Sequence, residues 1–180
     1  LACLKGLYLR ISELSERPQW SPVMSHFWQD NDGFWFLRIM GKGNKLRDVT
    51  LSDDFVEYLK RYRLYRGLPA LPRVDESEPL VHKIRGQGGM TVRQIRRLVQ
   101  QSFDLAKQSL LDDGFTDDAE QLESATVHWL RHTGATHDAQ TRPLKHLSED
   151  LGHSKIATTD QIYIQTNIKE RAKSGAKRKI

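Results

Sequence analysis

The chain has 180 residues and a net charge of +5, and its 38% hydrophobic and 28% charged residues are typical of one globular domain with its own core. No apolar run reaches the roughly 20 residues that a membrane-spanning helix needs, and no signal peptide opens the chain. The single cysteine, Cys3, excludes an internal disulfide, so we expect a reducing, cytoplasmic setting.

The two ends of the chain carry separate signals. Residues 169–180 hold six Lys or Arg and one Glu, whereas residues 1–168 hold equal numbers of basic and acidic side chains. Such a basic tail indicates either a nucleic-acid or acidic partner or only a solvated end of the chain. Because the chain begins with Leu1 inside an apolar pattern, we expect it to be a fragment of a longer protein.

The first 51 residues predict one helix and a small sheet. Leucine and isoleucine recur through residues 4–14, which predicts a helix that ends before Pro18. Residues 25–29 and 34–40 are aromatic and β-branched runs on either side of the turn sequence DNDG. With residues 46–51 after a second turn, they predict a three-stranded antiparallel sheet.

The rest of the sequence predicts mainly helices. Ser52 caps a helix that Gly67 ends, a proline-containing loop covers residues 68–80, and Thr91 caps a long amphipathic helix. Residues 112–123 are acidic and predict a loop. Three short helices are expected at about 126–139, 143–151 and 158–168. The fold class is therefore α+β, mostly helical, as one domain over residues 1–168.

Residues 128–137 read HWLRHTGATH, and three histidines within ten residues raise the question of a metal site. His128 and His132 are four residues apart and share a helix face, as in His-Glu-x-x-His zinc sites, but Trp129 stands where the glutamate belongs. The acidic pairs of the chain fall at a helix start or in loops, where capping or solvation explains them. We therefore expect no metal.

His128 and Arg131 are three residues apart and also face the same way. An arginine can bind a phosphate through two parallel hydrogen bonds, and a neighbouring histidine can donate to it or carry a proton. Further residues of suitable chemistry occur elsewhere in the chain: Arg10 and Glu13 in YLRISEL, Lys42 and Lys45 in GKGNK, and His153 and Tyr163 in LGHSKIATTDQIY. This composition favours phosphate chemistry over a metal site.

Four blocks in chain order, LRISEL, GKGNKLRDVTL, HWLRHTGATH and LGHSKIATTDQIY, resemble the catalytic domain of the tyrosine recombinases, also called the phage integrase family. The resemblance covers nearly all of the chain, and the last two blocks are the most specific. It implies that family's catalytic-domain fold and site-specific cleavage and rejoining of DNA through a covalent 3′-phosphotyrosine. It also implies that the helical N-terminal DNA-binding domain of the family lies outside this fragment.

The resemblance implies six catalytic residues, which bind the scissile phosphate, move a proton or attack: Arg10, Lys42, His128, Arg131, His153 and Tyr163. In this set Tyr163 is the nucleophile and Lys42 protonates the leaving hydroxyl. Lys45 competes with Lys42 for that role, and the position in the GKGNK turn favours Lys42. Glu13 matches an acidic position that holds neighbouring cationic groups in place.

The chemistry of this set is coherent without a metal ion or another cofactor. Two arginines directed at the non-bridging oxygens stabilise the extra charge of the transition state. Tyrosine, with an ordinary pKa of about 10, must lose its proton on attack, and a histidine or water can accept it. A lysine on a hairpin tip can return a proton to the departing 5′ oxygen. The ester retains the bond energy, so the step reverses without ATP.

Other residues of the same types receive structural interpretations. We expect His132 and His137 to hold their helix against the core, and His146 to lie on a helix surface. One helix carries three tyrosines that are expected on its surface or in the core: Tyr58, Tyr62 and Tyr65. Three arginines of the long helix either follow a DNA backbone or form a solvated face: Arg93, Arg96 and Arg97.

The expected partner is double-stranded DNA, with a tetrameric synapse on DNA in the full-length protein, no membrane, and a location in the bacterial cytoplasm at the nucleoid. The resemblance also implies that the segment around residues 164–175 docks on a neighbouring protomer. Two alternatives stay open, a type IB topoisomerase-like relaxing enzyme and a DNA-binding module without catalysis. The presence of Tyr163 argues against the second, because binding alone needs no tyrosine there.

Overall fold

A computed structural model describes residues 1–152 of the chain. Several predictions fall outside these residues: the helix over 158–168, the docking segment over 164–175, the basic tail over 169–180, and the site residues His153 and Tyr163. Within residues 1–152, no helix combines the length and the hydrophobicity that crossing a membrane requires.

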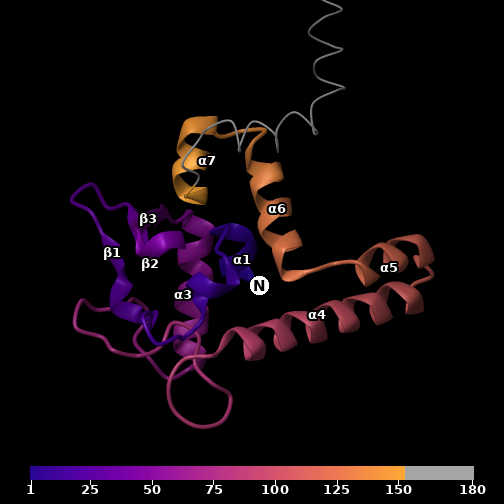
Figure 1. The fold of residues 1–180 in the computed structure, drawn as a ribbon, viewed down its shortest axis with the longest axis horizontal. Coiled ribbons are helices and arrows are strands. Elements are labelled where there is room, and N and C mark those ends of the chain that lie inside the picture. Colours follow the sequence, from indigo (N-terminus) through magenta and orange to yellow (C-terminus); the bar gives the residue numbers. More distant parts are fainter. Residues whose placement is uncertain (153–180) are drawn as a thin grey trace, which may run out of the picture.

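The predicted three-stranded antiparallel sheet is confirmed, in the order β1 (Phe27–Gln29), β2 (Trp35–Met40) and β3 (Leu46–Thr50). It lies at one side of the molecule (Figure 1). Leu37 on β2 pairs with Phe27 on one side and Val49 on the other, and these side chains are buried. The alternation of buried and exposed residues along β2 therefore fixes the register of the sheet.

The first strand begins two residues later than predicted. Residues Met24–His26 form a short 3₁₀ helix, η1, in place of extended chain. The Nδ1 atom of His26 accepts a hydrogen bond from the Val23 amide at 3.2 Å, and its ring stacks on Trp20 with centroids 4.7 Å apart. This side-chain bond to the local backbone stabilises the turn at the expense of the strand.

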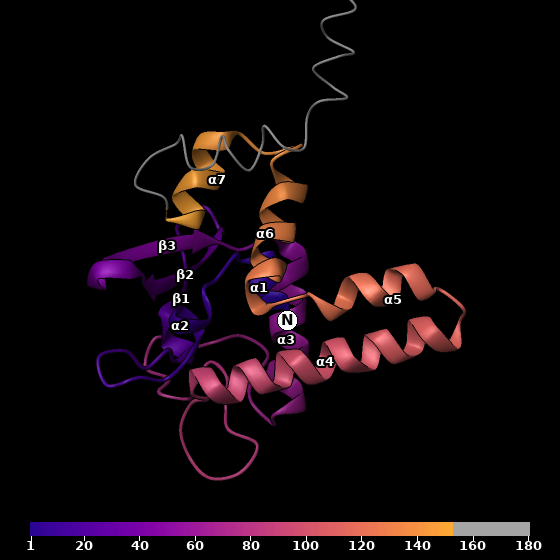
Figure 2. The ribbon, with the colours of Figure 1, turned by 45° about the vertical axis from the view of Figure 1, so that its right-hand side comes forward.

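The described residues also contain seven α-helices: α1 (Ala2–Gly6), α2 (Ile11–Leu14), α3 (Asp53–Tyr65), α4 (Val92–Asp112), α5 (Thr116–Glu123), α6 (Val127–Asp138) and α7 (Leu144–Leu151). Helices α4 and α5 lie side by side and extend away from the sheet, whereas α7 packs near β3 (Figures 1 and 2). The predicted cap is confirmed at Ser52, whose Oγ accepts from the Phe55 amide at 3.2 Å. The α+β class is confirmed.

The single helix predicted over residues 4–14 is wrong, because the chain breaks into α1 and α2 at Tyr8. Tyr8 adopts a φ of 51°, a left-handed conformation that costs free energy in any residue but glycine. Its carbonyl accepts a hydrogen bond from Arg131, and its hydroxyl donates to Asp138. Tertiary contacts made far along the chain therefore override the local helical pattern.

The acidic loop predicted over residues 112–123 is also wrong, since Thr116–Glu123 form α5. Asp117 and Asp118 lie in the first turn of this helix, where their charge interacts favourably with the helix dipole. Ala119 is fully buried. Asp117 and Asp118, predicted to lie in a solvated loop, therefore begin a helix.

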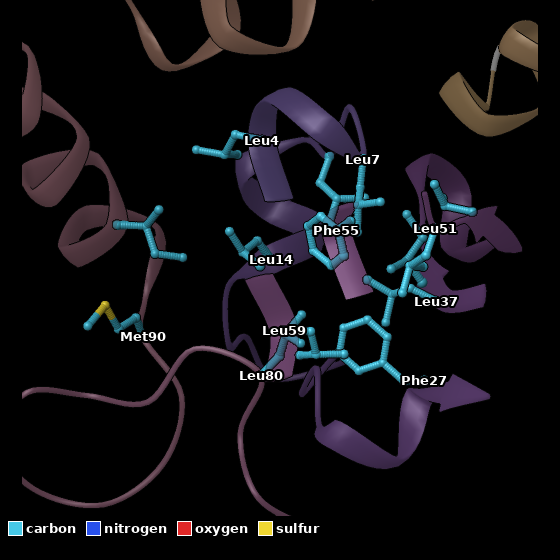
Figure 3. Packing of buried hydrophobic residues seen from close by; sticks show 14 of the residues in the cluster. Leu4, Leu7, Leu14, Phe27, Leu37, Leu51, Phe55, Leu59, Leu80 and Met90 are labelled. Atoms are coloured by element: carbon cyan, nitrogen blue, oxygen red, sulfur yellow. The ribbon is translucent and has the colours of Figure 1, made fainter. Parts of the chain in front are cut away.

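The main core lies between the sheet, α1, α2, α3 and the first half of α4 (Figure 3). Its labelled members are buried side chains of α1, α2, α3, β1 and β2 and of the segments between elements: Leu4, Leu7, Leu14, Phe27, Leu37, Leu51, Phe55, Leu59, Leu80 and Met90. Helix α4 adds Ile95, Val99 and Phe103. A second cluster joins Tyr8 to Ala135 of α6 and to Leu147 and Leu151 of α7. Helices α6 and α7 are thus anchored to the α1–α2 junction.

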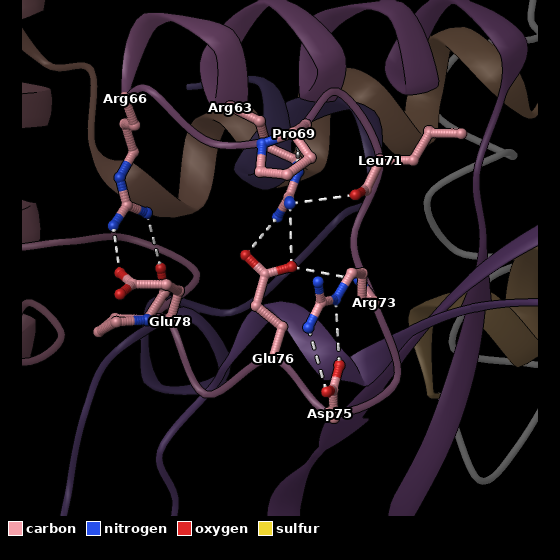
Figure 4. Close-up of polar contacts among 9 residues, drawn as sticks. Arg63, Arg66, Pro69, Leu71, Arg73, Asp75, Glu76 and Glu78 are labelled. Carbon is pink, nitrogen blue, oxygen red and sulfur yellow. Dashed lines mark hydrogen bonds and ion pairs between the residues drawn. The ribbon is translucent and has the colours of Figure 1, made fainter.

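A buried ion pair between Arg63 and Glu76 holds the long loop after α3 in place (Figure 4). Arg63 is fully buried, and its guanidinium donates to the carbonyl of Pro69 at 2.8 Å and to that of Leu71 at 3.0 Å. It also pairs with both carboxylate oxygens of Glu76, at 3.0 and 2.9 Å. Because each polar atom has a partner, the loop is held against α3 without regular secondary structure.

We expect Glu76→Gln to lower the free energy of unfolding by about 3 kcal/mol, because it leaves the buried charge of Arg63 without its counter-ion. Urea denaturation followed by circular dichroism measures the change. The matched control is Asp75→Asn in the exposed Arg73–Asp75 pair, which should leave the urea midpoint unchanged. Equal midpoints for both variants would contradict the proposed role of Arg63.

Candidate active site

Arg131 of α6 is the best-fixed cationic side chain of the candidate site. It is buried, and its guanidinium donates to the carbonyl of Tyr8 and, at 2.7 Å, to that of Leu151. These carbonyls belong to the α1–α2 junction and to the end of α7. Burial, followed by the charge of nearby Arg10, lowers the pKa of Arg131 to about 10, so the side chain stays protonated at neutral pH.

Arg10 stands at the start of α2 and is paired with Glu13. Its guanidinium donates to Glu13 Oε1 at 2.9 Å, and its backbone amide donates to Oε2 at 2.7 Å. Burial alone would raise the pKa of the Glu13 carboxyl, but hydrogen bonds from Arg47 and the charges of both arginines hold that pKa below its usual value. The predicted role of Glu13 as a holder of cationic groups is consistent with this geometry.

Arg10, His128 and Arg131 line one cavity of about 490 Å³. Arg96 of α4 lines it too, beside apolar residues of α4 that include Val99. Arg10 lies far along the chain from His128 and Arg131, so the fold has to bring these residues together. This meeting was expected from the motifs, and the structure places three of the six predicted site residues at a single cavity.

His128 lies one turn before Arg131 on α6 and lines the same cavity. Partial burial, then the positive charges of Arg131, His132 and Arg10, lower its pKa from the ordinary value. The imidazole is therefore neutral at pH 7 and can accept a proton or a hydrogen bond.

We expect His128 to titrate below the ordinary pKa of about 6.5. The unfolded chain binds this proton at a higher pH than the folded chain does. The contribution of the neutral His128 ring to the free energy of unfolding is therefore fully present above pH 6.5, and it is lost as the pH falls through the pKa of the folded state. An NMR titration of the histidine rings, with His128→Gln to assign the signal, measures the value. A pKa at or above 6.5 would contradict this environment.

Lys42 and Lys45 lie on the turn between β2 and β3, where residues Lys42–Asn44 form the 3₁₀ turn η2. Both lysine side chains are exposed, and neither lines the cavity. The base of the hairpin is close to the site, because Gly41 packs against Glu13 and Arg47.

The structural interpretation of two histidines is wrong. His132 and His137 are exposed on α6 rather than packed against the core, since the buried face of that helix carries Arg131, Gly134 and Ala135. The surface position of His146 is confirmed. Among residues 1–152, no three His, Cys, Asp or Glu side chains gather as a metal-binding group.

The tyrosines of α3, expected on the surface or in the core, are exposed, as are the arginines of α4. The exposed side chains are those of Tyr58, Tyr62, Tyr65, Arg93, Arg96 and Arg97. Of these, Arg96 reaches the cavity. Its position favours contact with a bound ligand over a purely solvated role.

Two residues of the site were missed by the motifs, Tyr8 and Arg47. Tyr8 supplies the carbonyl that holds Arg131, and Arg47 pairs with Glu13. A signal for Arg47 existed in the sequence, because it is two residues before the buried Val49 on β3 and lies opposite the buried Ile39. A charged residue on the inward face of a strand requires a buried partner.

A cavity lined by three arginines and a neutral imidazole, on a small α+β domain, defines a site suited to a phosphate group. The family profile described as "Phage integrase family" matches residues 8–170. The chain therefore belongs to the phage integrase family, whose members are the tyrosine recombinases, as the four sequence blocks predicted.

Curated relatives of the chain are bacterial recombinases. It is 34% identical to tyrosine recombinase XerD of Staphylococcus saprophyticus over 129 residues, which covers 71% of this chain and 38% of that protein. It is 32% identical to tyrosine recombinase XerC of Chlorobaculum parvum over 165 residues, covering 89% of this chain and 42% of that protein. The chain thus spans about two fifths of the length of these relatives.

Solved structures share the fold. XerH site-specific recombinase bound to difH substrate matches with a TM-score of 0.54 and 25% identity, over 87% of this chain and 40% of that one. XerA recombinase matches with a TM-score of 0.60 and 22% identity, over 99% of this chain and 57% of that one. The tyrosine-recombinase catalytic fold predicted from the motifs is confirmed.

Proposed function

We propose that this chain is the catalytic domain of a site-specific tyrosine recombinase, which cleaves and rejoins DNA through a covalent 3′-phosphotyrosine. The observation that carries the proposal is the cavity where Arg10, His128 and Arg131 meet. Three separate contacts fix the two arginines there: Glu13 holds Arg10, and two backbone carbonyls hold Arg131. Such fixed cations stabilise a phosphorane-like transition state without reorganising during the reaction.

The remaining roles are those that the resemblance to the tyrosine recombinases implies. Tyr163 attacks the phosphorus and breaks the bond to the 5′ oxygen, so the DNA strand becomes esterified to the tyrosine. His128, neutral at pH 7, accepts the phenol proton directly or through water. Lys42 on the exposed hairpin returns a proton to the departing 5′ oxygen, and His153 donates to the phosphate. Attack by a 5′-hydroxyl reverses the step.

The partner proposed for this domain is double-stranded DNA, in a tetrameric synapse formed by the complete recombinase in the bacterial cytoplasm. Two structural neighbours support the first part, since XerH is bound to difH substrate and the Tn1549 transposon integrase is in complex with a circular intermediate DNA. The exposed arginines of α4, one of which reaches the cavity, provide a cationic surface for a DNA backbone.

A trapping experiment tests the proposed function. Nicked duplexes with a randomised core are incubated with the intact protein, and a cleavage event releases a short strand so that the covalent complex cannot religate. We expect an adduct that survives denaturing electrophoresis with the wild type and with Tyr65→Phe, whose ring is 90% exposed on α3. Tyr163→Phe should form none.

Each outcome of this experiment is decisive. An adduct that persists in Tyr163→Phe would remove Tyr163 as nucleophile. Specific DNA binding by the wild type without an adduct on any retained duplex would show a binding module rather than an enzyme. Relaxation of supercoiled DNA without strand exchange between duplexes would indicate a relaxing enzyme of the same chemistry.

A further inference from the structure

Arg47 of β3 contacts three parts of the proposed site: the pair of Arg10 and Glu13, the hairpin turn at Gly41, and the end of α7. Its guanidinium forms two hydrogen bonds to the buried carboxylate of Glu13, with Nη1 at 2.6 Å from Oε1 and Nη2 at 3.0 Å from Oε2. Its Nε donates to the carbonyl of Asp150 at 3.0 Å. The side chain is 14% exposed, so solvent screens these contacts only weakly.

The same guanidinium is enclosed by two glycines. A methyl group added at Gly41 would lie 2.9 Å from Nη1, and one added at Gly152 would lie 2.9 Å from Cδ and Nε. Gly41 directly precedes Lys42, and Gly152 directly precedes His153. Gly152 ends α7 with a φ of 64°, which favours glycine at this position independently.

Glu13 connects Arg47 to the phosphate-binding side chain. Its two carboxylate oxygens accept four hydrogen bonds, two from Arg47 and two from the guanidinium and the amide of Arg10. Removing Arg47 would leave half of these acceptor positions empty. Since the Arg10 side chain is only half-buried, its orientation in the cavity depends on how firmly the carboxylate is fixed.

We propose that Arg47 is a positioning residue for DNA cleavage, which fixes Arg10 through Glu13 and ties this pair to the end of α7 through the Asp150 carbonyl. Arg47 itself does not line the cavity, so it acts on the reaction through Arg10 rather than on the DNA. This inference rests on the proposed function. Lysine cannot replace Arg47, because one ammonium group cannot match the bidentate contact to Glu13 and also reach Asp150.

The test measures single-turnover formation of the covalent adduct at saturating nicked DNA, for Arg47→Met and Arg47→Lys in the intact protein. We expect both variants to cleave about 10²-fold more slowly than the wild type, as for a misplaced catalytic group. The Kd for DNA should change less than about threefold, because Arg47 lies outside the cavity. The matched control is Arg38→Met, which removes the half-exposed partner of Asp48 on the neighbouring strand and should change neither value.

A methylphosphonate at the scissile position separates positioning from a general loss of structure. This group is neutral, so it needs less of the charge that Arg10 supplies. For one of its two diastereomers, the rate ratio between wild type and Arg47→Met should fall at least tenfold below the ratio on ordinary DNA. A merely structural role would give the same ratio on every substrate.

Several results would overturn the inference. These are wild-type cleavage rates in both variants, a ratio unchanged by the methylphosphonate, or unfolding of Arg47→Lys at the assay temperature. The last result would show that Arg47 maintains the domain and not the orientation of Arg10. Absence of any adduct with the wild type is a different result, because it removes the proposed function itself.

Discussion

Arg131→Lys is expected to lower the rate of DNA cleavage about 10³-fold, the upper range for loss of a preorganised charge donor at a transition state. The variant keeps a positive charge, but a single ammonium group cannot bond to the carbonyls of Tyr8 and Leu151 and also present a fork to the phosphate. Single-turnover adduct formation on nicked DNA measures the rate, with circular dichroism to establish that the variant is folded.

The matched control for this variant is Arg96→Lys. Arg96 lines the same cavity but is exposed on α4, so its replacement should leave the cleavage rate at saturating DNA within about threefold of the wild type. A folded Arg131→Lys protein that cleaves at the rate of this control would show that Arg131 has no specific role in the chemistry.

Gly134→Ala is expected to lower the free energy of unfolding by about 3 kcal/mol, the upper range for overpacking. Gly134 lies where α6 crosses α1, and an added Cβ would be 2.0 Å from the Lys5 carbonyl oxygen and 3.3 Å from the Tyr8 ring. The Lys5 carbonyl oxygen belongs to the backbone and cannot rotate away as a side chain can, so α1 and α6 must separate. Urea denaturation measures the loss.

Gly6→Ala is the control for the crossing of α1 and α6. Gly6 ends α1, and a Cβ there would make an ordinary contact of 3.6 Å with the Phe55 ring. Because alanine favours a helix by up to about 1 kcal/mol over glycine, this variant should be neutral or slightly stabilised. A Gly134→Ala protein as stable as Gly6→Ala would contradict the close crossing.

Elements with a strong periodic pattern and a cap were predictable from the sequence. Thr91 caps the start of α4: its Oγ1 accepts a hydrogen bond from the Gln94 amide at 3.4 Å, and Gln94 Oε1 accepts one from the Thr91 amide at 2.9 Å. Helix α7 ends at Gly152, as expected for a left-handed C-cap. Local hydrogen bonding decides these boundaries, so a local pattern is enough to place them.

Elements whose conformation depends on distant contacts were not predictable in this way. Tyr8 takes a strained conformation because Arg131 and Asp138, from the other end of the described chain, bond to it. Burial of Ala119 stabilises α5 within a sequence that reads as an acidic loop. In both cases tertiary packing outweighs the intrinsic preference of the segment.

Some features of the site were likewise predictable from the sequence, and others were not. Motif order identified Arg10, His128 and Arg131, and the fold brings them to one cavity. The prediction that His132 and His137 hold their helix against the core was wrong, because the side of α6 that packs against α1 is lined by Gly134 and Ala135 instead. A helical repeat shows which residues share a face, but the neighbouring element decides which face is buried.

The most direct test of the account is to identify the amino acid that carries the DNA. The wild-type adduct on nicked DNA is formed in the presence of a chelator, digested with protease and nuclease, and the nucleotide-bearing peptide is sequenced by mass spectrometry. The account predicts a nucleotide joined through its 3′-phosphate to Tyr163, and a free 5′-hydroxyl on the released strand. Attachment to another residue, or through a 5′-phosphate, would contradict it.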